Sequence, residues 1–270
     1  MKTRAITGAV FVIVVLGATW LSEWSYLTLI LAVQAVCLVE LSRMLNPDNK
    51  YALSVITLSQ VLALFASAVI ALQKINGLSA VSSISKTPLL VLCSLIICCM
   101  LPVFILMFRN EGFIDAIKVH AIGLLLISFP CYFLLMIRDM GPELIVSILA
   151  IIWTHDTFAY LTGKMIGKTK LAPSISPGKT WEGTSGGVLF GIAAAIGLSF
   201  WLNMPITKAI GLGLVCTIFA NLGDLLESKI KRESGVKDSG SFMPGHGGMF
   251  DRFDALLGAA IPVTLYLMYF

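Results

Sequence analysis

Long apolar segments with almost no charged residues constrain the fold of this chain more than any other feature of its sequence. Of the 270 residues, 57% are hydrophobic and 13% are charged. A soluble globular domain carries about 25% charged residues. A helix needs about 20 apolar residues to cross the bilayer core, whereas barrel strands are short and alternate in polarity. The sequence therefore predicts an all-α integral membrane protein with no large soluble domain.

About nine segments have the length and composition of transmembrane helices. The first follows Lys2 and Arg4 and resembles a signal peptide in its charge pattern. It lacks a small-x-small cleavage signal and ends in bulky residues, so we interpret it as a retained span. The predicted spans are 5–21, 26–44, 51–72, 88–108, 120–137, 143–162, 186–202, 206–226 and 253–270.

Lysine and arginine are distributed unequally between the two sides of these spans. With nine spans and a cytoplasmic N-terminus, fifteen of the 19 basic residues fall in inner segments. Because basic loops stay on the cytoplasmic side, the sequence predicts a cytoplasmic N-terminus and a C-terminus on the outer side. The four basic residues of the outer loops are Lys74, Lys86, Arg138 and Lys208.

The two parts of the chain differ in polar content. Residues 1–112 form N-terminal spans nearly free of acidic groups, and we interpret the exception, Glu40, as a helix-end partner of Arg43. Residues 113–270 carry the polar and glycine-rich segments, mainly in predicted cytoplasmic loops 164–186 and 227–252. The six cysteines lie in apolar segments without a CxxC pair, so neither a zinc site nor a disulfide framework is indicated. We therefore expect the functional site in the C-terminal region.

One polar stripe lies within the predicted span 143–162. On a helix, Asp156, Tyr160 and Gly163 fall close to one face. A carboxylate at membrane depth is costly unless it meets a cation, a basic partner or a polar cavity. The spacing predicts that Asp156 and Tyr160 line a cavity. The alternative is an aspartate that only bonds a neighbouring helix.

The predicted loop 164–186 has the composition of a phosphate-binding segment. Two prolines and a glycine prevent a continuous helix, so backbone amides and the hydroxyl groups of Ser176 and Thr180 become available. Lys179 stands just before the next span, and exposed amides with a lysine at a helix start suit phosphate oxygens. The segment does not match the Walker pattern, and an ordinary basic loop is the alternative.

The end of the predicted span 206–226 aligns three functional groups. Asp224, Ser228 and Lys231 share one helix face, at steps of four and three residues. This places a carboxylate, a hydroxyl and an ammonium group in line from the membrane toward the cytoplasm.

Two further carboxylates stand at the start of the last span. Asp251 and Asp254 are three residues apart, so a helix projects both to one side. Carboxylates among many basic residues hold Mg²⁺ or a similar hard cation, which neutralises a polyphosphate. We therefore expect Asp224 and Asp251 to hold the cation with Asp254 as a further ligand. A solvated loop with incidental ion pairs is the alternative.

These segments resemble the phosphatidate cytidylyltransferases (CDP-diacylglycerol synthases) over roughly residues 150 to 256. Met243 stands where Leu, Ile or Phe is expected, and Ala255 where Ser often follows. The matching motifs are Asp156-x-x-Ala159-Tyr160-x-x-Gly163, Ser174-x-Ser176-Pro177-x-Lys179-Thr180-x-Glu182-Gly183, Ser228-x-Ile230-Lys231-Arg232, Lys237-Asp238-x-Gly240 and Pro244-x-His246-Gly247-Gly248-Met249-x-Asp251-Arg252-Phe253-Asp254.

The resemblance implies a Mg²⁺-dependent reaction of CTP with phosphatidate that yields CDP-diacylglycerol and pyrophosphate, and it allows a second metal ion. It implies catalytic roles for Asp224, Asp251, Lys231 and Arg232. The substrate-binding residues that it implies are Asp156, Tyr160, Ser176, Lys179, Thr180, Ser228, Lys237, Asp238, His246, Gly247, Gly248 and Arg252.

The same resemblance, with the charge asymmetry, implies a multi-pass protein of the inner (cell) membrane whose active site faces the cytoplasm. The partners are then the bilayer and its lipid, with no nucleic acid. Small residues from Gly191 to Gly197 are compatible with a homodimer. An ion-coupled secondary transporter is the alternative from another class. A CTP-dependent polyprenol kinase is the alternative within the same chemistry.

Overall fold

The computed structural model of the chain describes residues 2–45, 54–62, 64–65, 100, 102–108, 112–242 and 247–270. The predicted spans 51–72 and 88–108 lie largely outside these residues. Their described parts are helical at 54–62, 64–65 and 102–107.

The long elements of the described residues are helices, as the apolar composition predicts. The π-helical turn η1 (Leu124–Ser128) joins two of them into one continuous stretch. The α-helices are α1 (Lys2–Leu21), α2 (Glu23–Leu45), α5 (Phe113–Gly123), α6 (Phe129–Met140), α7 (Pro142–Ile166), α8 (Trp181–Ser199), α9 (Ile206–Glu233) and α10 (Phe250–Tyr269).

Membrane character is confirmed by the helices themselves. Within the described residues, four stretches are long and apolar enough to cross a membrane. The number of nine spans and the orientation of the chain stay predictions. The four stretches are Glu23–Leu45, Phe113–Met140, Pro142–Ile166 and Ile206–Glu233.

The predicted loop 164–186 contains a β-hairpin that the all-α prediction did not include. Strand β1 (Lys170–Ala172) pairs antiparallel with β2 (Ser176–Thr180). Helix α8 then begins at Trp181, earlier than the predicted span. Thr180 is its N-cap, and the Thr180 hydroxyl accepts a hydrogen bond from the Gly183 N–H at 3.1 Å. The hairpin is therefore joined directly to a helix rather than to a flexible segment.

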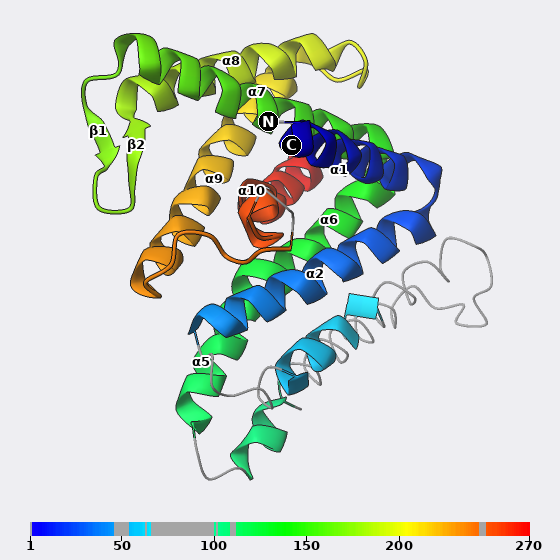
Figure 1. Cartoon of the computed structure of the whole chain (residues 1–270). Coiled ribbons are helices and arrows are strands. Elements are labelled where there is room, and N and C mark those ends of the chain that lie inside the picture. The colour runs from blue at the N-terminus through cyan, green and yellow to red at the C-terminus, as the bar shows by residue number, and fades with distance from the viewer. Residues whose placement is uncertain are drawn as a thin grey trace, which may run out of the picture.

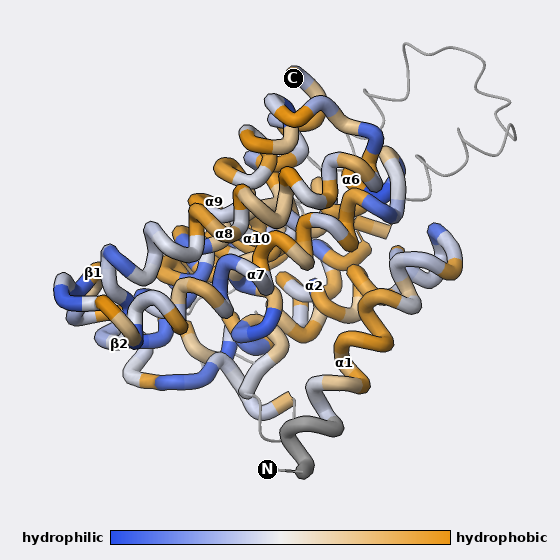
Figure 2. Tube along the Cα trace, turned by 90° about the horizontal axis from the view of Figure 1, so that it is seen from above, coloured by the Kyte–Doolittle hydropathy of each residue, from blue (hydrophilic) through white to orange (hydrophobic). Residues whose placement is uncertain are grey.

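The C-terminal helices pack closely around α9. Figure 1 shows α10 between α9 and α6, with α7 and α8 crossing above and the hairpin projecting to one side. Hydrophobic residues follow the helices in Figure 2, and hydrophilic residues gather around β1 and β2. The polar end of the bundle therefore lies where the sequence places the motifs predicted to bind phosphate.

Glycines bring α9 and α10 into backbone contact. A Cβ atom on Gly223 would lie 2.8 Å from the Cα of Gly258 and 2.6 Å from the Asp254 carbonyl oxygen, which is closer than side-chain atoms can approach. In the stretch predicted for a homodimer, Gly191 packs against Thr217 within the chain, whereas Gly197 faces open space. The Gly223 contact places the acidic residues at this end of α9 beside those of α10.

We predict that Gly223→Val separates α9 from α10 and lowers the melting temperature by roughly 2–10 °C, because overpacking costs about 1–3 kcal/mol. The matched control is Gly197→Val, which makes the same change on a helix without a nearby atom. Thermal unfolding in detergent measures both. Equal melting temperatures for the two variants would contradict the close contact.

Candidate active site

A polar cavity of about 400 Å³ lies between α7, the hairpin, α8 and α9. It brings together the residues of three separate sequence motifs, Asp156 and Tyr160 from α7, Lys179 from β2 and Asp224 from α9. The predicted cavity-lining position of Asp156 and Tyr160 is thus present. The full lining is His155, Asp156, Ala159, Tyr160, Gly163, Lys164, Ser176, Gly178, Lys179, Thr180, Thr184, Asn221 and Asp224.

The hairpin is held against α8 by its own polar contacts. The Glu182 carboxylate accepts hydrogen bonds from the Lys168 and Thr169 backbone N–H groups at 3.1 Å. Hydrogen bonds from its own backbone N–H and from that of Lys168 lower the pKa of Glu182 to about 2. The Trp181 N–H also donates to the Thr169 carbonyl at 2.9 Å. These contacts fix the direction in which β2 presents its side chains to the cavity.

Lys179 connects the hairpin to α9 across the cavity. Its ammonium group lies 2.7 Å from Asp224 Oδ2 and donates to Asn221 Oδ1 at the same distance. Ser176 and Thr180 line the same cavity, and the buried Thr180 hydroxyl is engaged in the α8 cap. The predicted grouping of Ser176, Lys179 and Thr180 is therefore found around one cavity.

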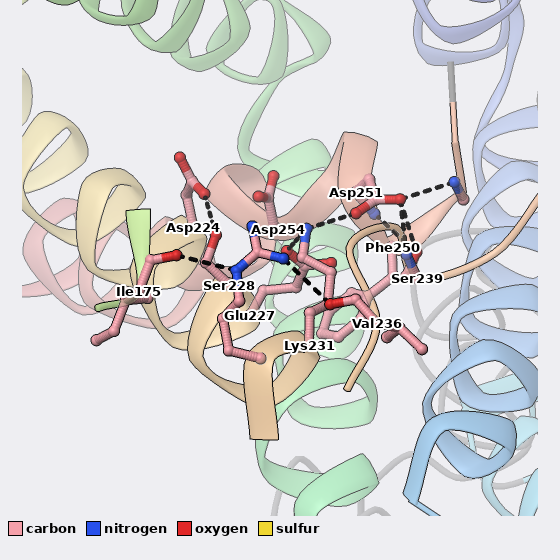
Figure 3. Close-up of polar contacts among 12 residues, drawn as sticks. Ile175, Asp224, Glu227, Ser228, Lys231, Val236, Ser239, Phe250, Asp251 and Asp254 are labelled. Carbon is pink, nitrogen blue, oxygen red and sulfur yellow. Dashed lines mark hydrogen bonds and ion pairs between the residues drawn. The ribbon is translucent and has the colours of Figure 1, made fainter. Parts of the chain in front are cut away.

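Three carboxylates form a tight group where α9 meets α10. Asp224, Glu227 and Asp254 each have a carboxylate oxygen within 4.8 Å of the other two. Ser228 donates to Asp224 Oδ1 at 3.2 Å, as their shared helix face predicts (Figure 3). We refer to Asp224, Glu227 and Asp254 as the carboxylate trio. Two of the three predicted metal ligands, Asp224 and Asp254, belong to the trio, the third, Asp251, does not, and Glu227 is an addition.

The donor set of the trio fits a hard divalent cation. Glu227 is almost fully buried, and its Oε1 has no hydrogen-bond partner among the described residues. Its Oε2 faces the Lys231 ammonium at 2.5 Å as an ion pair. A buried carboxylate oxygen without a donor is costly. A cation with oxygen ligands supplies the missing contact, so these residues suit Mg²⁺ or a similar ion.

Asp251 stands beside the trio rather than in it. Its Oδ1 accepts a hydrogen bond from Lys231 at 2.6 Å, and its Oδ2 accepts from the Gly248 and Ser239 N–H groups at 2.8 and 2.9 Å (Figure 3). Both of its oxygens are thus engaged by the protein. In this structure Asp251 positions Lys231, and the expectation that Asp251 is itself a metal ligand stays a prediction.

Other predicted residues lie at the end of α9, in the segment after it and at the start of α10. The guanidinium of Arg232 donates from Nε to the Ile175 carbonyl at 3.3 Å and from Nη1 to the Val236 carbonyl at 3.2 Å, which ties α9 to the hairpin. Gly247 has a φ of 84° and packs against Asp251. His246 lies outside the described residues. In this part of the chain, the predicted residues with exposed side chains are Arg232, Lys237, Asp238 and Arg252.

A second cavity of about 330 Å³ opens on the other side of the trio. Its walls come from η1, α6, α9 and α10, and they are apolar except for Glu227 and Asp254. Asp224 lines the first cavity, so the trio lies between a polar cavity and an apolar one. The full lining is Leu125, Leu126, Pro130, Phe219, Leu222, Gly223, Leu226, Glu227, Phe250, Asp254, Leu257, Gly258, Ile261 and Pro262.

Three residues near the site were not assigned from the sequence. Glu227 lies three residues after Asp224, a helical spacing that signals a shared face. His155 is buried, lines the polar cavity and has no hydrogen-bond partner for Nδ1 among the described residues. The interpretation of Glu40 as a partner of Arg43 was wrong, because its carboxylate bonds the backbone at the start of α10.

Comparison with known proteins adds independent information. The model of the cytidylyltransferase family matches residues 2–270. A phosphatidate cytidylyltransferase of Bacillus subtilis is 31% identical over 273 residues, which cover 99% of this chain and 97% of the relative. A phosphatidate cytidylyltransferase of Staphylococcus aureus is 45% identical over 122 residues, or 44% of this chain and 47% of the relative. One of Haemophilus influenzae is 42% identical over 136 residues, or 48% and 47%.

We predict that Glu227→Gln weakens the binding of Mn²⁺, a spectroscopic substitute for Mg²⁺, by about tenfold or more, because it removes a charged oxygen ligand. The matched control is Glu233→Gln on the same helix, where the exposed carboxylate pairs with Lys229. Electron paramagnetic resonance of free and bound Mn²⁺ measures the affinity. Unchanged affinity in a folded Glu227→Gln protein would remove Glu227 from the metal site.

Proposed function

The chain belongs to the cytidylyltransferase family, and from this premise we propose that it transfers a cytidylyl group from CTP to phosphatidate. The products are CDP-diacylglycerol and pyrophosphate. The observation that carries the proposal is the position of the carboxylate trio between a polar cavity and an apolar cavity. A reaction between a water-soluble nucleotide and a membrane lipid needs such a junction.

The polar cavity suits the triphosphate of CTP. Lys164 and Lys179 line it, and Ser176 and Thr180 of the hairpin lie in the same wall. Lys179 neutralises Asp224 in the structure. We propose that its ammonium group contacts phosphate oxygens when CTP is bound, while Asn221 remains within reach to orient it.

The apolar cavity suits the acyl-bearing end of phosphatidate. Its leucine, phenylalanine and proline side chains contact hydrocarbon favourably, and its only acidic lining residues among those described, Glu227 and Asp254, belong to the trio. A lipid seated there has its phosphate beside the carboxylates. Lys231 stands next to the trio, between Glu227 and Asp251, and supplies positive charge.

The chemistry needs positioning more than an activated side chain. A phosphomonoester is largely dianionic near neutral pH, since its second pKa is about 6. Its oxygen forms a bond to the α-phosphorus of CTP, and the bond from that phosphorus to the bridging oxygen breaks, which releases pyrophosphate. The residues of this chain hold the two anions together and neutralise their charge. Mg²⁺ held by Asp224, Glu227 and Asp254 would add charge neutralisation at the phosphates.

The orientation of the reaction follows from the same proposal. CTP is supplied from the cytoplasm, and the basic residues of the predicted inner segments favour a cytoplasmic position for the hairpin and the end of α9. We therefore propose an inner-membrane protein with about nine spans, a cytoplasmic N-terminus and a cytoplasmic active site. We also propose that substrate is contacted by Lys237, Asp238, His246 and Arg252.

An assay of the purified protein with CTP, Mg²⁺ and phosphatidate tests the function through its products. We expect pyrophosphate and CDP-lipid in equal amounts, with none when Mg²⁺ is removed by a chelator. A CTP-dependent kinase would instead release CDP and leave a newly phosphorylated lipid. Substituting polyprenol for phosphatidate is the matched control for acceptor class. The absence of product with every lipid phosphate would contradict the proposal and favour transport.

A further inference from the structure

Glu40 connects the N-terminal helix α2 to the active-site region. It is the acidic residue of α2 that lies in the protein interior, with 5% of its surface exposed. Its carboxylate reaches Ser239, Met249 and Phe250, about 200 positions further along the chain. A buried carboxylate is costly unless several donors satisfy it. Its partners therefore indicate what it does.

The donors come from the start of α10 and from the loop before it. The Met249 N–H donates to Oε1 of Glu40 at 3.0 Å, and the Phe250 N–H donates to Oε2 at 2.9 Å. The Ser239 hydroxyl lies 3.1 Å from the same Oε2. N–H groups at a helix start have no partner within the helix, and a negative charge there is also favoured by the helix dipole. Glu40 thus caps α10 from another helix.

Two glycines make room for this carboxylate. A Cβ atom on Gly248 would lie 2.6 Å from Glu40 Oε2, and a Cβ on Gly240 would collide with Oε1. Glycine at these two positions therefore leaves the space that the Glu40 carboxylate occupies. Both positions lie against Glu40, and a side chain at either one would exclude its carboxylate.

A continuous chain of polar contacts leads from Glu40 to the carboxylate trio. The Ser239 hydroxyl lies 3.0 Å from Asp251 Oδ2, and Asp251 Oδ1 lies 2.6 Å from the Lys231 ammonium. Lys231 in turn pairs with Glu227 of the trio. Figure 3 shows Asp251 between Ser239 and Lys231. Because the Ser239 hydroxyl has a single proton, Glu40 and Asp251 share one donor, and loss of one acceptor changes the bond to the other.

We infer that Glu40 is a positioning residue of the active site, which holds Ser239, Asp251 and hence Lys231 in place without contacting substrate. The inference rests on the proposed cytidylyl transfer, because it assigns Glu40 a role in the efficiency of that reaction. It also gives the N-terminal helices a function beyond membrane anchoring, since α2 carries the residue that fixes the loop.

Glu40→Gln tests the carboxylate with little change in volume. The amide oxygen of glutamine accepts one backbone N–H, but its NH₂ group then faces the other N–H as a second donor. The charge at the start of α10 is lost as well. The matched control is Gln34→Leu, because Gln34 is equally buried on α2 and bonds Ser128 rather than the loop.

The kinetic test is a double-mutant cycle between Glu40→Gln and Ser239→Ala. We expect Glu40→Gln to lower kcat by about 10- to 100-fold, as for other residues that orient ligands, with KM for CTP changed by less than about threefold. The double variant should be no slower than the slower single variant, because both changes break one chain of contacts. Gln34→Leu combined with Ser239→Ala should instead give independent effects.

Hydrogen exchange supplies a readout that does not depend on activity. The amides of Met249 and Phe250 should exchange about tenfold faster in Glu40→Gln, because each loses a bond to a charged acceptor, and they should be unchanged in Gln34→Leu. If Glu40→Gln does not yield folded protein, Glu40→Asp, which keeps the charge on a shorter side chain, replaces it in both measurements.

Several outcomes would overturn the inference. Multiplicative effects of Glu40→Gln and Ser239→Ala on kcat would show that they act separately. Faster exchange with an unchanged kcat would reduce Glu40 to a structural cap while leaving the proposed function intact. A wild-type protein with no cytidylyl transfer would defeat the proposed function, whereas the exchange data would still report whether Glu40 holds the loop.

Discussion

The mutual repulsion of three carboxylates between α9 and α10 is the constraint on which the rest of the site depends. Two unit charges about 4 Å apart repel by roughly 4 kcal/mol at an effective dielectric constant of 20. Asp224 is neutralised by Lys179 from the hairpin, and Glu227 by Lys231 from its own helix. The glycine contact between α9 and α10 holds the two helices close together at the trio. The trio is therefore expected to bind a metal ion, whose positive charge would reduce the repulsion between the carboxylates and also neutralise bound phosphates.

The elements around the carboxylate trio each contribute a contact that positions one of its charged neighbours. The hairpin is needed because its lysine reaches Asp224 from across the polar cavity. The loop before α10 is needed because Ser239 and Gly248 hold Asp251, which in turn holds Lys231. Helix α2 contributes through Glu40, which bonds the first residues of α10. Residues from three distant parts of the sequence thus fix the position of two lysines.

The sequence predicted the parts of this arrangement that depend on local spacing. The α9 stripe of Asp224 and Ser228 is confirmed as a direct contact, and the prolines near the hairpin correctly excluded a continuous helix. Glu227 was missed because its burial depends on how α10 packs against α9, which one helix does not reveal. The contact of Glu40 with Phe250 spans 210 residues. No periodicity encodes a pairing of that length, so only the tertiary structure shows it.

The central claim is that Asp224, Glu227 and Asp254 hold a cation where the polar and apolar cavities meet. Anomalous scattering from crystals of the protein grown with Mn²⁺ and a non-hydrolysable CTP analogue tests it most directly. The account predicts a peak at ligand distance, about 2.0–2.3 Å, from oxygens of the trio, with the nucleotide phosphates on the Lys179 side. A peak held by Asp251, with Lys231 displaced and the trio unoccupied, would contradict it.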